Sequence, residues 1–142
     1  MKNTAIVDAG PLIALFDQSD HYHQKAKQRL ETYRKDNGIL ITTWPAVAEA
    51  AHLIRHRVHF QAQLDFLEWI SLGGVEFFPL ERDHLSRVIQ LQSQYSNLPM
   101  DLADATLVVT AEISNIDKVF SIDRDFSIYH LPVKKHFHNL MK

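Results

Sequence analysis

The sequence contains no cysteine, which excludes disulfide bonds and thiolate metal sites. No apolar run approaches the roughly 20 residues that a membrane-spanning helix needs, so we expect no membrane association. The N-terminal segment also lacks the long apolar stretch of a secretory signal. A cytoplasmic location is therefore the simplest expectation.

Basic residues are not in excess either. Fifteen Lys and Arg against 17 Asp and Glu give a formal net charge of −2. Strong sequence-independent binding of nucleic acid usually shows as a basic excess. Any nucleic-acid role would therefore need local basic patches, divalent cations or a second subunit.

The chain has instead the composition of one globular domain. Its 142 residues are 46% hydrophobic and 23% charged, which suits a real core. It shows no internal repeat, low-complexity tract or linker-like stretch. We therefore expect a single domain over residues 1–142.

Short apolar strands alternate with helical patterns along this domain. Strands are predicted at 5–7, 39–43, 75–78 and 118–122, with a weak fifth at 131–133. Helices are predicted at 11–16, from 19 or 20 to 36, and at 45–57, 60–72, 81–95 and 100–109. This alternation predicts an α/β sandwich with a mainly parallel sheet and helices on both faces.

Carboxylates stand where the predicted strands end or the next helices begin. Asp8 and Asp123 directly follow the first and fourth strands, whose carboxyl ends share one edge of a parallel sheet. Glu49 lies early in the helix after the second strand. Asp101 and Asp104 are three residues apart, on one face of a helix start. The acids thus converge on one edge.

Each acid alone has a simpler structural explanation. Asp8 can cap the helix that follows it, and the helix macrodipole favours Asp101 and Asp104 near a helix start. The segment 123–125 can be an ordinary polar turn. Glu49 is harder to explain, because a charge in an Ala- and Val-rich helix is seldom buried without a partner.

Taken together, crowded carboxylates repel each other, and their pKa values rise unless a cation shares the site. Oxygen ligands without cysteine suit a hard ion such as Mg²⁺ or Mn²⁺. Such sites hydrolyse phosphodiesters by activating water and stabilising charge on the attacking and leaving oxygens. The acids therefore predict a metal-dependent phosphodiesterase site.

Four stretches resemble PIN-domain ribonucleases, especially the single-domain VapC-type toxins of prokaryotic toxin–antitoxin pairs. They are IVDAGPLIALFDQSDHYH, TTWPAVAEAAHLI, LPMDLADATLVVTAE and VFSIDRDF, and the resemblance spans essentially the whole chain. By position, it implies that the catalytic, metal-binding acids are Asp8, Glu49, Asp104 and Asp123. Asp101 and Asp125 match further possible metal ligands, and Ser121 a position that often holds Ser or Thr near the site.

The resemblance implies a PIN-like three-layer sandwich with sheet order 3-2-1-4-5, in which Asp8 and Asp123 are adjacent. It also implies an Mg²⁺- or Mn²⁺-dependent endoribonuclease that hydrolyses RNA with a metal-activated water. The implied partners are an RNA substrate, a second copy of the chain and an antitoxin laid across the active-site groove.

Other functions stay open at this point. A PIN-fold nuclease could process RNA outside a toxin–antitoxin pair, and a PIN fold could also serve as a noncatalytic binding module. A receiver domain fits poorly, because the third strand ends at Phe78-Pro79-Leu80 without the phosphoacceptor Asp.

His52 and His56 have the i,i+4 spacing of some zinc sites. A zinc hydrolase would need a Glu beside the first His, where Leu53 stands, and a third ligand. With their basic neighbours they form a cluster at 52–59 that could meet RNA phosphates or be a solvated helix end. The cluster comprises His52, Arg55, His56, Arg57 and His59.

The aromatic residues Trp44, Trp69, Phe77 and Phe78 stand in apolar contexts. We therefore expect them to pack in the core rather than to stack on nucleic-acid bases.

Overall fold

The computed structural model describes residues 3–132 and 135–142. At its centre is a five-stranded sheet of order β3-β2-β1-β4-β7, in which every neighbouring pair is parallel. Its strands are β1 (Thr4–Val7), β2 (Ile39–Thr42), β3 (Glu76–Phe77), β4 (Lys118–Phe120) and β7 (His138–Asn139). The predicted parallel α/β architecture and the order of its first four strands are confirmed.

The weak fifth strand predicted at 131–133 is found in part, but it does not belong to the central sheet. Leu131 belongs to β5 (His130–Leu131), which pairs antiparallel with β6 (Lys135–His136) in a separate two-stranded sheet, and Val133 lies outside the described residues. The true edge strand is β7, whose two polar residues carry no apolar pattern. Its place is set by backbone pairing instead: His138 N donates to Asp117 O at 2.8 Å and Leu140 N to Val119 O at 2.7 Å.

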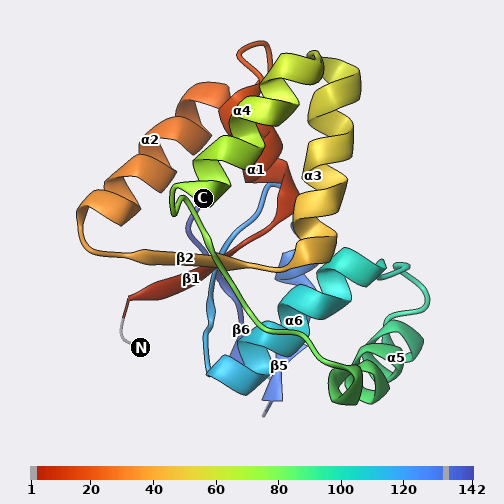
Figure 1. The fold of residues 1–142 in the computed structure, drawn as a ribbon. Helices are drawn as coiled ribbons and strands as arrows, with labels where there is room; N and C mark the ends of the chain where they lie inside the picture. The colour runs from red at the N-terminus through yellow and green to blue at the C-terminus, as the bar shows by residue number, and fades with distance from the viewer. Residues whose placement is uncertain (1–2, 133–134) are drawn as a thin grey trace.

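Helices cover both faces of the sheet (Figure 1). One layer holds α1 (Ala9–Phe16), α2 (His23–Lys35), α3 (Trp44–Arg57) and α4 (Phe60–Ser71), and the other holds α5 (Leu85–Gln94) and α6 (Leu102–Ser114). Strand alternation supplies both cores, because Ala5 and Val7 pack toward the first layer and Ile6 toward the second. The result is the three-layer sandwich that the sequence predicts.

Several helix boundaries differ from the prediction. The second helix begins at His23, because the Asp20 carboxylate accepts from Tyr22 N at 2.8 Å in a turn before the helix. The predicted helix 81–95 is split into the 3-10 turn η1 (Arg82–His84) and α5. The helix predicted at 100–109 runs on to Ser114 and ends at Asn115, which takes the left-handed conformation with φ 55°.

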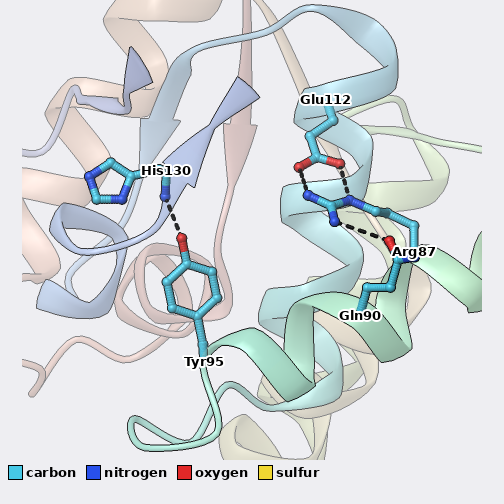
Figure 2. Close-up of polar contacts among 5 residues, drawn as sticks. All are labelled: Arg87, Gln90, Tyr95, Glu112 and His130. Atoms are coloured by element: carbon cyan, nitrogen blue, oxygen red, sulfur yellow. Dashed lines mark hydrogen bonds and ion pairs between the residues drawn. The ribbon is translucent and has the colours of Figure 1, made fainter. Parts of the chain in front are cut away.

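Two side-chain contacts fix α6 in place. The hydroxyls of Thr43 and Thr106 lie 2.8 Å apart, which joins the end of β2 to α6. Arg87 on α5 donates two hydrogen bonds to Glu112 on α6, Nε to Oε1 at 2.8 Å and Nη2 to Oε2 at 2.7 Å (Figure 2). Within the described part of the chain, no helix is long and apolar enough to cross a membrane.

Candidate active site

Asp8 stands at the carboxyl end of β1 and is both a helix cap and a member of the acid cluster. Its Oδ1 accepts from Ala9 N at 2.8 Å, and its Oδ2 accepts from the Ser121 hydroxyl at 3.0 Å. The side chain is buried, with 5% of the residue exposed. Gly10 lets the start of α1 pack closely against Ile122, because a Cβ at position 10 would lie 3.3 Å from Ile122 Cβ.

The end of β4 brings Ser121 and Asp123 beside Asp8. Val7 of β1 pairs with Phe120 of β4, so the residues that follow the two strands are neighbours. Ser121 Oγ also accepts from Asp123 N at 3.1 Å. Asp123 in turn caps the 3-10 turn η2 (Arg124–Ser127), and its Oδ1 accepts from Asp125 N at 3.0 Å.

The first turn of α6 supplies two more acids. Asp101 is exposed and caps the helix, its Oδ1 accepting from Asp104 N at 2.8 Å. Asp104 is buried at 7% exposure, and its Oδ2 accepts from the Tyr129 hydroxyl at 2.9 Å. The cap at Asp101 thus holds the backbone of Asp104, while Tyr129 holds its carboxylate.

Glu49 approaches the same group from α3, where it is half-buried. Its pKa is raised by burial first, then by the negative charges of Asp101 and Asp123. Four separate elements of the fold therefore bring carboxylates to one edge of the sheet.

The electrostatics of this edge raise the pKa values of two of its acids. Burial raises the pKa of Asp8 to about 7, with hydrogen bonds from Ala9 and Ser121 opposing the rise and the charges of Glu49 and Asp123 adding to it. Burial, followed by the charges of Asp8 and Asp101, raises the pKa of Asp104 to about 8, although the Tyr129 hydroxyl opposes this. A positive charge at the site would stabilise both carboxylates.

Three of the acids lie close enough to share one ion. Asp104, Asp123 and Asp125 each offer an oxygen within 4.8 Å of the others. This all-carboxylate donor set fits Mg²⁺ or Mn²⁺ by ligand type. Asp8, Glu49 and Asp101 lie outside the tight group, whereas Asp125, a secondary choice from the sequence, lies within it.

Two residues of the site were missed by sequence reasoning. Tyr129 contacts Asp104 across 25 positions of sequence, which no local pattern indicates. The Asn139 amide clamps the backbone of Ser121, accepting from its N at 3.2 Å and donating to its O at 2.9 Å. A buried Tyr and an edge-strand Asn have no distinctive spacing that could have identified them.

The prediction that Trp44 packs in the core is wrong. Trp44 is 61% exposed, and its ring stacks on that of Phe77, with centroids 4.1 Å apart and an interplanar angle of 16°. Trp44 is the first residue of α3, two positions before the first buried residue of the helix, Ala46. Phe78 is buried and Trp69 packs edge-on against Phe16, as the sequence indicated.

The cluster at 52–59 is exposed at the end of α3. Its members His52, Arg55, His56, Arg57 and His59 all face solvent, and the His52 and His56 rings lie 4.3 Å apart. The cluster begins at His52, about one helical turn after Glu49 on the same helix.

Two hollows of the structure differ in whether they are lined by one of the acids. A cavity of about 680 Å³ between α1, α2 and α4 contains none of the six acids. A smaller hollow of about 260 Å³ is lined by Ser121, Asp123 and Arg124. Of the six acids, Asp123 thus borders the smaller of these two hollows.

Comparisons with known proteins agree with this geometry. Residues 5–130 match the model of the PIN domain. Ribonuclease VapC26 of Mycobacterium tuberculosis is 24% identical over 119 residues, covering 84% of this chain and 86% of its own. The crystal structure of M. tuberculosis VapC20, described as a sarcin-ricin loop cleaving toxin, superposes with a TM-score of 0.76 at 19% identity, covering 87% of this chain and 93% of VapC20. These matches confirm the resemblance that the motifs indicated.

Proposed function

Because this chain belongs to the PIN domain family, we propose that it is a divalent-metal-dependent endoribonuclease and the toxin of a type II toxin–antitoxin pair. The observation that carries the proposal is a cluster of three carboxylates. Oxygens of Asp104, Asp123 and Asp125 lie within 4.8 Å of one another. The proposed unit is a single PIN domain over residues 1–142.

The residues that we assign to catalysis and metal binding are Asp8, Glu49, Asp104 and Asp123, with Asp101 and Asp125 as further ligands. When bound, Mg²⁺ or Mn²⁺ would activate water and neutralise charge on the scissile phosphate. The surrounding residues of the protein would orient these carboxylates through hydrogen bonds. Ser121 orients Asp8 through a 3.0 Å hydrogen bond, and the Asp101 cap fixes the first turn that carries Asp104.

The proposed partners are RNA, a second copy of the chain and an antitoxin protein, in the cytoplasm. RNA is supported by the names of the relatives, one a ribonuclease and one a toxin that cleaves the sarcin-ricin loop. The lack of a basic excess supports a role for the cation in RNA binding, because the acids alone would repel phosphate.

The test is to express the protein alone and to map cleaved transcript ends. We expect growth arrest and new RNA ends with the wild-type protein and neither with Asp8→Asn. Glu68→Gln, which changes an exposed acid on α4, is the matched control and should behave as the wild type. Equal cleavage by Asp8→Asn would contradict the assignment.

Two alternatives give different outcomes in the same experiment. An RNA-processing nuclease outside a toxin–antitoxin pair would produce defined RNA ends without growth arrest. A noncatalytic PIN-fold binding module would produce no new ends, and in calorimetry it would bind its partner without divalent metal.

A further inference from the structure

Tyr129 is a fully buried residue whose hydroxyl ends on one of the proposed metal-binding acids. The residue is 0% exposed, and its hydroxyl donates to Asp104 Oδ2 at 2.9 Å. We propose that Tyr129 is a positioning residue, which fixes the Asp104 carboxylate in the orientation that binds the divalent cation. This inference rests on the proposed function.

The contact leaves Asp104 able to serve as a ligand. A carboxylate has two oxygens, and a hydrogen bond to Oδ2 leaves Oδ1 free. Without that bond the side chain could rotate away from Asp123 and Asp125, with which it shares the 4.8 Å group. Outer partners of this kind hold ligands in place and commonly change metal affinity when they are removed.

Tyr129 is itself held rigidly. Its ring packs edge-on against Phe126 at 5.1 Å and against Tyr95 at 5.0 Å between centroids. Its backbone N donates to Asp125 O at 3.1 Å. One short segment therefore places the Asp125 carboxylate and the hydroxyl that orients Asp104, so the two ligands are set by the same turn.

The neighbouring Tyr95 provides a matched comparison. Its ring touches Tyr129, but its hydroxyl accepts from His130 N at 2.9 Å and contacts a backbone group rather than an acid (Figure 2). Tyr129→Phe and Tyr95→Phe each remove one hydroxyl from the same aromatic cluster. Only the first removes a partner of Asp104.

The experiment measures Mn²⁺ affinity by calorimetry and by electron paramagnetic resonance, in which the signal of free Mn²⁺ decreases as the ion binds. Tyr129→Phe should bind Mn²⁺ about 10- to 100-fold more weakly than the wild type, the range typical for such outer partners. Tyr95→Phe should bind Mn²⁺ with wild-type affinity. In an Asp104→Asn background, Tyr129→Phe should cause no further loss, because its effect passes through Asp104.

Cleavage kinetics supply a second readout. At limiting Mn²⁺, Tyr129→Phe should lower kcat with little change in KM for RNA, and a higher Mn²⁺ concentration should restore the rate. Wild-type Mn²⁺ affinity in Tyr129→Phe, or an equal loss in Tyr95→Phe, would overturn the positioning role. A wild-type protein that binds Mn²⁺ but cuts no RNA would defeat the proposed function alone, and the affinity comparison would still decide the role of Tyr129.

Discussion

Asp8 and Asp104 are acids that the fold keeps partly protonated near neutral pH. Both are buried, and both face other carboxylates, so their pKa values rise to about 7 and about 8. In the absence of a cation these residues cost folding free energy whenever they ionise. A proposed metal site therefore predicts an unusual dependence of stability on pH.

We expect the metal-free protein to lose stability as pH rises. An acid whose pKa is higher in the folded state than its ordinary 3.8 binds its proton more tightly in the folded protein. Its contribution to the free energy of unfolding is therefore fully present below a pH of about 4. That stability disappears as pH rises through about 7 for Asp8 and about 8 for Asp104. Urea unfolding in EDTA should show a loss of several kcal/mol, because each tenfold difference in proton affinity between the folded and unfolded states is worth about 1.4 kcal/mol.

The control for this prediction is Asp104→Asn, which cannot ionise at that position. Its free energy of unfolding should change less with pH than that of the wild type. Comparing the two proteins also cancels the titration of the nine histidines, which both share. Added Mn²⁺ should restore the stability of the wild type at a pH of about 8.5, where both acids are ionised. A wild-type curve no steeper than that of Asp104→Asn would contradict the pKa assignment.

Asp8, Asp101, Asp104 and Asp123 could be proposed from the sequence because each follows a strand or begins a helix. The sequence could not show which carboxylates share the closest space, and it ranked Asp125 below Glu49. That ranking depends on the short turn η2, which places Asp125 next to its cap Asp123. Tyr129 was missed for the same reason, since its contact with Asp104 exists only in the folded chain.

At the scale of elements, the buried strands and the edge strand β3 were predictable, whereas the other edge strand, β7, was not. β1 and β4 are short apolar runs because both of their faces are covered. β7 is paired on one side only and consists of His138 and Asn139, so hydrophobicity did not reveal it. Its backbone pairing is nonetheless part of the site, because it brings the Asn139 amide to Ser121.

The first turn of α3 offers an exposed aromatic surface on the same edge as the acids. Trp44 follows β2 and stacks on Phe77 at the end of β3, the strand that pairs with β2. We predict that Trp44→Ala weakens binding of single-stranded RNA about tenfold, because stacking of one base is worth roughly 1–3 kcal/mol.

Fluorescence anisotropy with a labelled oligonucleotide tests this prediction, in an Asp104→Asn background so that the RNA stays intact. Leu72→Ala is the control, since Leu72 is 79% exposed at the end of α4 rather than beside the acids. Equal affinity of Trp44→Ala and Leu72→Ala for RNA would show that Trp44 makes no base contact.

At the scale of the whole molecule, the outer face of α5 exposes two large apolar side chains. Leu85 and Ile89 lie one turn apart on α5 and are 51% and 62% exposed. We predict that this face forms the homodimer, because pairing two copies would cover both side chains.

Sedimentation velocity is the measurement for the dimer. The wild-type protein should sediment as a dimer and Ile89→Asp as a monomer, while the control Leu72→Asp stays dimeric. A wild-type protein that is monomeric over a wide concentration range would contradict the dimer prediction.

We propose that carboxylates from four elements of the fold form one metal-dependent ribonuclease site. Its most direct test is the rate at which purified protein cleaves single-stranded RNA with Mn²⁺ and with EDTA, for the wild type and for Asp104→Asn. We predict cleavage by the wild type only with Mn²⁺, and a rate at least about 100-fold lower for Asp104→Asn. Wild-type cleavage in EDTA, or an undiminished rate in Asp104→Asn, would contradict the claim.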